Sequence, residues 1–142
     1  MVDHPIAVLG QTGYMTCVSM GNPHTVLYGI DLSTLTPRQL EEEGRRLETD
    51  GRFPERTNVH FVEVNGPAEV TVLIWERGSG ATAACGTGVA AVCVAGVLTG
   101  RSQRRITAHV PGGDLQLEWR AADTHVYLTG PAVEIFTGQW PA

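Results

Sequence analysis

The segment WERGSGATAACGTGVAAVCVAGVLTG, residues 75–100, decides the fold of this chain. Its second half, GTGVAAVCVAGVL from Gly86 to Leu98, has a small or apolar residue at every position, so a helix there has no polar face to turn to water. Gly100 follows as a C-terminal cap, because glycine takes up a positive φ without steric cost. About thirteen residues at 1.5 Å each span roughly 20 Å. We expect this helix to be buried on all sides, with strands packed around it.

Short runs of β-branched and aromatic residues between turn residues make up most of the remaining chain, which is typical of strands. The expected strands are residues 14–20, 58–64, 70–75, 105–110, 115–119, 126–128 and 133–136. The sequence GGD at 112–114 predicts a hairpin turn between two of them. A first helix is predicted to begin at Pro37 and to end near Glu48, with Thr36 as its N-cap and Gln39 completing a capping box.

The size and composition of the chain indicate one globular domain. It has 142 residues, of which 42% are hydrophobic and 18% charged, and we predict a single domain over residues 1–142. The predicted fold class is α+β, a mixed β-layer wrapped around a buried central helix. The first helix should have a solvated face, formed by Glu41, Glu42, Glu43, Arg45 and Arg46.

Charge and cysteine content exclude several classes of function. The net charge is −5 and basic residues cluster only at 45–46 and 101–105, so we expect no nucleic-acid partner. Cys17, Cys85 and Cys93 form neither a disulfide framework nor a zinc-ligand spacing, which favours a reducing cytoplasm. The first residues do not have the pattern of a secretory signal. The uncharged run 78–100 has a first half of Gly, Ser, Thr and Ala, so we expect no membrane span and predict a cytoplasmic protein.

Cys85 lies where a Gly-rich loop enters the buried helix. Free amide groups and the helix dipole stabilise a thiolate there, so we expect the pKa of Cys85 to fall below the usual value of about 8.5. The amides of Gly86 and Thr87 could hold a carboxylate or an enolate-like oxyanion beside the sulfur. Cys85 could equally be a small residue that only packs. A phosphate-binding loop is disfavoured, because the segment lacks both the Gly-Lys-Ser/Thr ending and a dinucleotide fingerprint.

Polar residues gather at the ends of three expected strands, in segments 21–24, 53–58 and 76–77. Arg77 can bind a carboxylate through two parallel hydrogen bonds, and His24 or Glu76 could take a proton from a thiol. Asn22 and Asn58 can each donate and accept a hydrogen bond. The simpler interpretation of each residue alone is structural: Asn22 and Asn58 cap turns, and Arg77 pairs with a neighbouring glutamate.

The chain resembles the diaminopimelate epimerases, which carry the same strings in the same order. Here the strings are VSMGNPH (18–24), FPERTNVHFVEV (53–64), WERGSGATAACGTG (75–88) and PGGDLQLEW (111–119). The resemblance extends from about Tyr14 to Phe136 and corresponds to the C-terminal half of the family's chain. It implies a pair of similar domains, each a β-layer around a central helix, with the active site in the cleft between them.

The resemblance also implies a reaction. Diaminopimelate epimerases interconvert LL- and meso-diaminopimelate, a step of lysine and peptidoglycan-precursor biosynthesis, without pyridoxal phosphate, metal or any other cofactor. One cysteine thiolate removes the α-proton while a second cysteine thiol donates a proton from the opposite face. Carried over by position, Cys85 is one of these two cysteines, and the amides of Gly86 and Thr87 bind the carboxylate at the reacting centre.

The same resemblance assigns the remaining polar residues. Asn22, Asn58 and Arg77 would hold the distal carboxylate of the diamino diacid. Glu76 and His24 would lie near the cysteine pair and help to set its protonation, and Glu76 would also contact the substrate.

The resemblance leaves out the second cysteine, which in the family lies in a Gly-Asn-Gly loop of the N-terminal half. Cys93 lies eight residues along the apolar helix and Cys17 lies in an expected strand, so neither is placed to oppose Cys85. We therefore expect this chain to be inactive without the N-terminal half. The exposed face around Cys85 should bind that half or form a homodimer. Ala81 stands where the pattern has a glutamate, which bears on the tuning of the loop.

Two other functions fit these residues. One is a non-catalytic module that binds carboxylates, and the other is a related isomerase of the proline racemase or phenazine-pathway type. Arg77 together with the two asparagines favours a substrate that has a distal carboxylate. A cysteine hydrolase using Cys85 with His24 is disfavoured, because the segments resemble none of the signatures of such enzymes.

Overall fold

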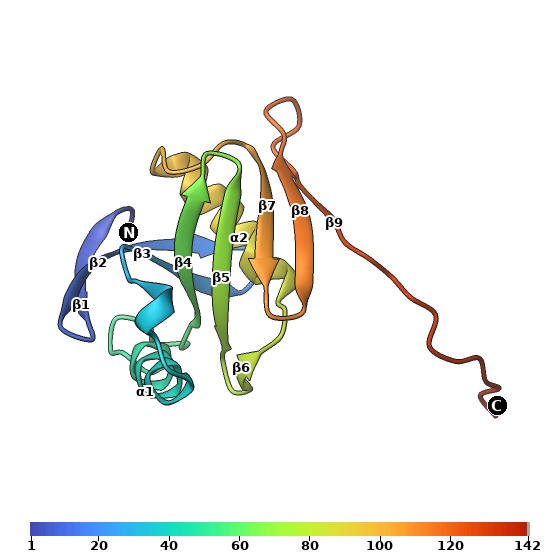
Figure 1. Cartoon of the computed structure of the whole chain (residues 1–142), viewed down its shortest axis with the longest axis horizontal. Coiled ribbons are helices and arrows are strands. Elements are labelled where there is room, and N and C mark those ends of the chain that lie inside the picture. Colours follow the sequence, from blue (N-terminus) through green and yellow to red (C-terminus); the bar gives the residue numbers. More distant parts are fainter. Residues whose placement is uncertain (142) are drawn as a thin grey trace.

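The computed structural model describes residues 1–141, and within them strands outnumber helices (Figure 1). In chain order the elements are β1 (His4–Val8), β2 (Gln11–Ser19), β3 (Pro23–Tyr28), the 3-10 helix η1 (Leu32–Thr34), α1 (Pro37–Glu48), β4 (Asn58–Gly66), β5 (Glu69–Glu76), β6 (Gly80–Thr82), α2 (Gly86–Leu98), β7 (Arg105–Val110), β8 (Gly113–Trp119) and β9 (Val126–Thr129).

One mixed sheet contains all of these strands. Their order is β1-β2-β3-β4-β5-β7-β8-β9, and β6 pairs with β5 beside this path. The β3–β4 and β5–β7 pairs are parallel and the other pairs are antiparallel. A parallel pair needs a long crossover, and α1 and α2 lie in the two crossovers. The predicted α+β class with a mixed β-layer is confirmed.

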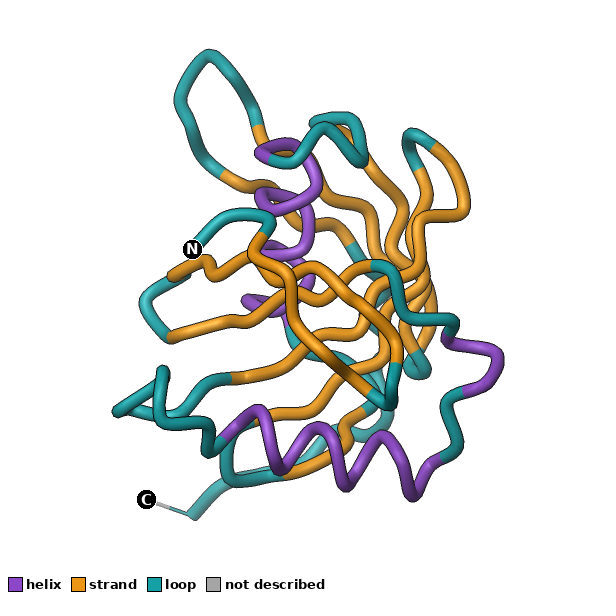
Figure 2. Tube along the Cα trace, turned by 90° about the vertical axis from the view of Figure 1, so that its left-hand side faces the viewer, coloured by secondary structure: helices purple, strands orange, loops and turns teal. Residues whose placement is uncertain are grey.

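The predicted central helix is present with the predicted bounds, Gly86–Leu98. It contacts β2, β3, β4, β7, β8 and β9, and Figure 2 shows the strands curving around it. Its apolar residues lie in one core with the inward side chains of these strands, such as Val72 and Ile106. Gly100 has a φ of 68°, and the amides of Gly100 and Arg101 donate to the last carbonyls of the helix, as in a Schellman cap. No helix within residues 1–141 is long and apolar enough to cross a membrane.

The other α-helix, α1, packs on the opposite face of the sheet, where a second hydrophobic core lies. Its capping box is formed as predicted: the Gln39 amide donates to Thr36 Oγ1 (3.3 Å), and the Thr36 amide donates to Gln39 Oε1 (3.0 Å). Glycine at position 44 lets the helix approach the sheet, because a Cβ there would lie 2.5 Å from the Trp75 ring. The outer face carries Arg–Glu ion pairs, which agrees with the predicted solvated surface.

Several expectations about strands need correction. Residues 133–136 form no strand; they lie in an irregular tail that follows β9. The strands β1, β3 and β6 were not expected. The Gly-Asn-Pro sequence at 21–23 is typical of a turn, but its proline is already the first residue of β3. The hairpin between β7 and β8 is present, but its two-residue turn is Pro111–Gly112, and Gly113 begins β8 with a φ of 128°.

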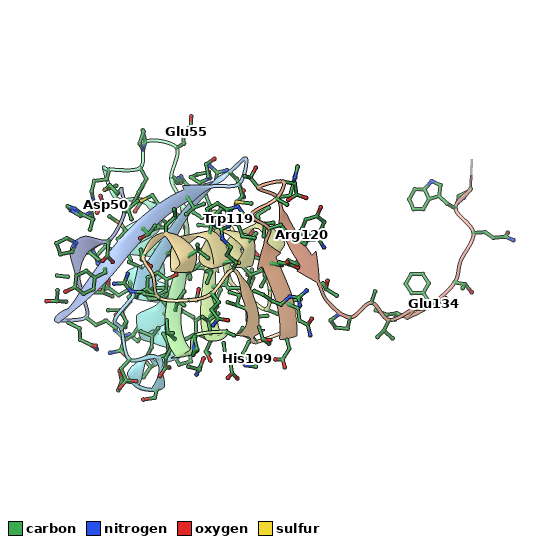
Figure 3. All side chains as sticks on the ribbon, turned by 90° about the horizontal axis from the view of Figure 1, so that it is seen from above. Asp50, Glu55, His109, Trp119, Arg120 and Glu134 are labelled. Carbon is green, nitrogen blue, oxygen red and sulfur yellow. The ribbon has the colours of Figure 1, made fainter. Side chains whose placement is uncertain are left out.

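The tail after β9 leaves the body of the protein as an extended chain (Figure 1). Glu134 on this tail lies far from the side chains of the sheet (Figure 3). The large apolar side chains of the tail are almost fully exposed: Val133 81%, Ile135 90%, Phe136 83% and Trp140 96%. These side chains are therefore not part of either hydrophobic core of the domain.

Candidate functional site

Cys85 is the N-cap residue of α2. Its backbone is extended (φ −142°, ψ 107°), and its side chain is 9% exposed. The residues on both sides, 83–84 and 86–87, are exposed, so the sulfur lies just beneath an open surface. The first amides of a helix have no acceptor within the helix. Gly86 and Thr87 therefore present backbone donors at the surface next to the thiol.

Burial raises the pKa of the Cys85 thiol. The hydroxyl of Thr87, 3.7 Å from Sγ, and the amide of Gly88 lower it, while the Glu76 carboxylate raises it further. The expected pKa below the ordinary thiol value is therefore wrong for this structure. The helix N-terminus does place donors at the sulfur, but the loss of water around a nearly covered thiol outweighs them.

Glu76 ends β5, and its carboxylate lies beside the thiol. The hydroxyl of Thr82 donates to Glu76 Oε1 (2.7 Å), which fixes the carboxylate across the β5–β6 pair. Gly78 in the turn between these strands (φ 79°) and Gly80 at the start of β6 (φ 87°) have a positive φ, which other residues rarely adopt. These glycines therefore allow the tight β5–β6 hairpin, which places Glu76 and Thr82 near Cys85.

His24 lies in a buried pair with His60. A hydrogen bond of 2.9 Å joins His24 Nδ1 and His60 Nε2, and a second hydrogen bond of 2.9 Å joins His24 Nε2 and Asn22 Oδ1. Burial lowers the pKa of His24 to about 4, with Glu76 raising it and Arg77 lowering it. Burial also lowers the pKa of His60 to about 3, and His24 contributes. Both imidazoles are therefore uncharged at neutral pH.

Asn58 and Arg77 are joined to each other. The Arg77 amide donates to Asn58 Oδ1 (2.9 Å), and Asn58 Nδ2 donates to the carbonyl of Pro23 (2.9 Å). The Arg77 guanidinium donates to the carbonyl of Glu55 (2.7 Å) and is otherwise exposed. The expected ion pair with a neighbouring glutamate is not among the ion pairs of residues 1–141. Arg77 therefore keeps several N–H donors available to a ligand.

The other two cysteines lie away from Cys85. Cys93 is fully buried in α2, where its thiol faces the carbonyl of Arg104 (3.6 Å). Cys17 lies in β2, against the core on the α1 side of the sheet. All three cysteines are free thiols. Neither Cys17 nor Cys93 faces Cys85 across a position where a substrate carbon could lie.

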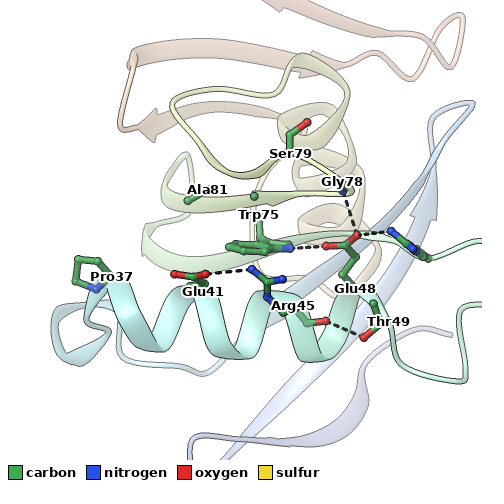
Figure 4. Close-up of a pocket in the computed structure, with 11 residues that line it drawn as sticks. Pro37, Glu41, Arg45, Glu48, Thr49, Trp75, Gly78, Ser79 and Ala81 are labelled. Carbon is green, nitrogen blue, oxygen red and sulfur yellow. Dashed lines mark hydrogen bonds and ion pairs between the residues drawn. The ribbon is translucent and has the colours of Figure 1, made fainter.

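A large cavity, of about 810 Å³, lies between α1 and the β5–β6 turn (Figure 4). It is lined by Pro37, Glu41, Arg45, Glu48, Thr49, Arg56, Trp75 and residues 78–81, and Cys85 is not part of it. Glu48 is 5% exposed and accepts from Trp75 Nε1 (2.7 Å) and the Gly78 amide (3.0 Å). This carboxylate anchors the hairpin that carries Glu76. The chemistry of the site favours the open face at Cys85 over this cavity.

Sequence reasoning missed three residues that shape the site: His60, Thr82 and Glu48. His60 has the one visible signal, because it is a polar residue between the apolar residues Val59 and Phe61 of a strand. Nothing in the local sequence distinguishes Thr82 from other loop hydroxyls or Glu48 from its exposed neighbours on α1. Their roles come from contacts between elements that are distant in the chain.

Comparison with known proteins identifies the family. A profile described as diaminopimelate epimerase matches residues 16–135. The chain belongs to the diaminopimelate epimerase family. It is 50% identical over 141 residues to the diaminopimelate epimerase of Moorella thermoacetica, covering 99% of this chain and 50% of that protein. It is also 46% identical to the chloroplastic diaminopimelate epimerase of Oryza sativa, covering 97% of this chain and 40% of that protein. The chain thus spans about half the length of these relatives.

Solved structures with lower identity share the fold. A phenazine biosynthesis protein of the PhzF family from Bacillus anthracis matches with a TM-score of 0.57 at 15% identity, covering 83% of this chain and 38% of that one. A hydroxyproline epimerase from Agrobacterium vitis matches with a TM-score of 0.53 at 16% identity, covering 84% of this chain and 40% of that one. The expected diaminopimelate epimerase-like domain fold is confirmed.

Proposed function

We propose that this chain is the C-terminal half of a cofactor-independent, two-base epimerase that interconverts LL- and meso-diaminopimelate. The observation that carries the proposal is Cys85 at the N-terminus of α2, beneath an open face and beside Glu76, in a chain that matches half of its relatives at about 50% identity. The expected cytoplasmic location and place in lysine biosynthesis belong to this proposal.

Cys85 acts as one base of the pair. In one direction its thiolate takes the α-proton, and in the other direction its thiol returns a proton to the α-carbon from the same face. The Thr87 hydroxyl and the Gly88 amide stabilise the thiolate. Burial and the Glu76 carboxylate favour the thiol, the form that returns the proton. Because an α-proton is weakly acidic, this transfer needs a dry site with donors aimed at the developing charge.

The exposed amides of Gly86 and Thr87 supply those donors. They bind the carboxylate at the reacting centre, where negative charge grows as the α-proton leaves. Arg77 binds the distal carboxylate with the N–H groups that its bond to the Glu55 carbonyl leaves over. Asn58 holds the backbone of Arg77 in place and offers its second amide hydrogen to the same carboxylate.

Asn22 links the two carboxylate sites. Its Nδ2 donates to Thr87 Oγ1 (3.4 Å), and its Oδ1 accepts from the ring of His24. His24 is uncharged at neutral pH, although the nearby Glu76 carboxylate raises its pKa. It therefore orients Asn22 and exchanges no proton with the thiol. This assigns His24 a positioning role next to the catalytic cysteine.

The partner of the chain is a domain that resembles the N-terminal half of the relatives and carries the second cysteine. The tail after β9 supports this part of the proposal. β9 lies at the edge of the sheet near the start of α2, where Leu128 approaches Gly86, and four large apolar side chains follow it with no partner among residues 1–141. Residues 133–136 have a strand-like sequence but form no strand in this domain. Pairing of this segment with a strand of the other half would explain the pattern.

A second candidate is a module that binds the diamino diacid without converting it. Two observations favour it: burial raises the pKa of the Cys85 thiol, and neither Cys17 nor Cys93 opposes Cys85. The two candidates share the carboxylate-binding residues and differ only in whether a second cysteine completes the site.

A matched pair of variants separates them. The chain is mixed with the complementary N-terminal half of a relative, and conversion of LL- to meso-diaminopimelate is followed with Cys85→Ser and with Cys17→Ser. We expect the first variant to lose at least about 100-fold in rate, as for removal of an acid/base group, and the second to keep full rate. No conversion by the unaltered pair would favour the binding module, and equal rates for the two variants would refute the role of Cys85 as a base.

A further inference from the structure

His60 is fully enclosed below the first turn of α2. It lies in β4 on the face of the sheet that carries His24 and α2, and its side chain is 0% exposed. Glycine at position 88 makes room for its ring, because a Cβ there would lie 2.8 Å from Nε2 and closer still to Cε1. An imidazole in this position has no freedom to turn. Its hydrogen bond to His24 therefore has a fixed geometry.

The direction of the hydrogen bonds follows from the acceptor at one end. Asn22 Oδ1 can only accept, so the hydrogen of the uncharged His24 ring lies on Nε2. The Nδ1 of His24 is then a bare acceptor, and His60 Nε2–H must donate to it. This leaves His60 Nδ1 without a hydrogen, and that atom is buried without a partner. A buried lone pair without a donor is tolerated more easily than a buried N–H without an acceptor.

The same direction continues to the sulfur. Asn22 Nδ2 donates to Thr87 Oγ1 (3.4 Å), and Thr87 Oγ1 lies 3.7 Å from Cys85 Sγ. A hydroxyl that accepts from Asn22 keeps its own hydrogen for another acceptor. The acceptor within reach is the sulfur. Every donor in the chain His60, His24, Asn22 and Thr87 then points toward Cys85.

We propose that His60 is a positioning residue: by donating to His24 Nδ1 it fixes the donor direction of this chain, so that the Thr87 hydroxyl donates to Cys85 Sγ. The proposal rests on the proposed function only for the role of Cys85 as a base. Without the His60 donor, His24 can move its hydrogen to Nδ1 and accept at Nε2 from a reversed Asn22 amide. The Thr87 hydroxyl then donates to Asn22 Oδ1, and the thiolate loses that donor.

Of the other groups that face these residues, Glu76 and Arg77 are held by contacts that do not include His60, whereas Gly88 packs against the His60 ring. Glu76 and the Gly88 amide face Cys85, and Glu76 and Arg77 face His24. Thr82 holds the Glu76 carboxylate, and Asn58 holds the backbone of Arg77. Any substitution of His60 also alters the packing against Gly88, so the hydrogen-bond chain is reported by the difference between a side chain with a donor and one without.

The first test needs no substitution. The ring nitrogens of His24 in the ¹⁵N-labelled chain are assigned by two-dimensional NMR at pH 7. We expect the hydrogen on Nε2 of His24 and on Nε2 of His60. A hydrogen on Nδ1 of His24 overturns the proposal, because the direction of the chain is then the reverse.

The second test compares His60→Leu with His60→Gln in a Cys17→Ser background. Glutamine places an amide donor near the position of the imidazole Nε2, and leucine has no donor. The rate of Cys85 alkylation by iodoacetamide is measured as a function of pH. We expect His60→Leu to raise the apparent pKa of Cys85 and to slow alkylation at pH 7.5 by at least about threefold, and His60→Gln to restore the pH profile.

A merely structural role predicts a different result. Both variants would then lower the unfolding temperature while leaving the pH profile of Cys85 unchanged or equally shifted, and either result overturns the proposal. Because neither test uses a substrate, their outcome is separate from the proposed function. An inactive reconstituted pair with the expected alkylation profiles would refute the epimerase and leave the role of His60 standing.

Discussion

Gly88→Ala tests how closely the start of α2 is fitted to the buried histidine. An added Cβ would lie 2.8 Å from His60 Nε2, 3.0 Å from Nδ1 and closer to Cε1. Carbon atoms do not approach other heavy atoms this closely, so either the ring or the helix must move. The His60 ring is buried and hydrogen-bonded to His24, and strands surround α2. Neither can move without breaking a contact.

The expected magnitude follows from two opposing effects. Overpacking a fitted core costs about 1 to 3 kcal/mol. Alanine is favoured over glycine in a helix interior by about 1 kcal/mol, but residue 88 lies in the first turn, where this gain is smaller. We therefore expect Gly88→Ala to lower the free energy of unfolding by about 1 to 3 kcal/mol. In a His60→Ala background, where the ring is gone, the same change should be neutral or slightly stabilising.

A double-mutant cycle measures the coupling between the two positions. It compares the unaltered chain, Gly88→Ala, His60→Ala and the double variant by urea unfolding, followed by circular dichroism. We expect a coupling free energy of at least about 1 kcal/mol between positions 88 and 60. Gly86→Ala is the matched control in the same helix turn, because its Cβ would meet only Leu128 at 3.9 Å, and we expect a change within about 0.5 kcal/mol. A coupling near zero would refute the enclosed position of His60.

Three further predictions concern pH, the buried carboxylate and the tail. Because the pKa values of His24 and His60 are lowered to about 4 and about 3, the unfolded chain, with histidine pKa values of about 6.5, binds more protons below that pH. The free energy of unfolding, measured by urea titration, should therefore fall as pH decreases from 6.5 toward 4, by about 1 kcal/mol or more between pH 6.5 and 5. His60→Gln should make this dependence on pH weaker. The same dependence in both chains would contradict the lowered pKa of His60. Glu48→Ala leaves the buried Trp75 Nε1–H without its acceptor and should destabilise the chain in urea by about 1 to 3 kcal/mol, while Glu48→Gln keeps an acceptor and should destabilise it less; equal losses would contradict this role. Removal of residues 131–142 should leave the thermal unfolding midpoint unchanged and abolish co-elution with the N-terminal half, whereas a lowered midpoint would show that the tail stabilises this domain.

Much of the fold was predictable because the decisive patterns are local. A helix without a polar face has to be enclosed, and α2 appears with its predicted bounds and its glycine cap. The capping box of α1 is likewise a local signal. The pairing of β3 with β4 and of β5 with β7 was not predictable, because a parallel pair forms between strands separated by a crossover, and no local residue pattern encodes its register.

The site shows the same division between local and distant effects. Cys85 at the helix start follows from the sequence, but the direction of its pKa shift does not, because burial by distant strands outweighs the local donors. The bond between His24 and His60 joins two residues that lie 36 positions apart in the chain. Residues 133–136 have the sequence of a strand but no neighbouring strand in this domain, so a local pattern alone did not decide their structure.

We propose that this chain is half of an epimerase, with Cys85 as one of its two bases. The most direct test is proton NMR of LL-diaminopimelate in D₂O under reducing conditions, first with this chain alone and then with the complementary N-terminal half added. We predict no exchange of the α-proton with the chain alone, and exchange with formation of the meso isomer after the addition. Turnover by the chain alone would contradict the need for the N-terminal half, because the second base would then lie within these 142 residues.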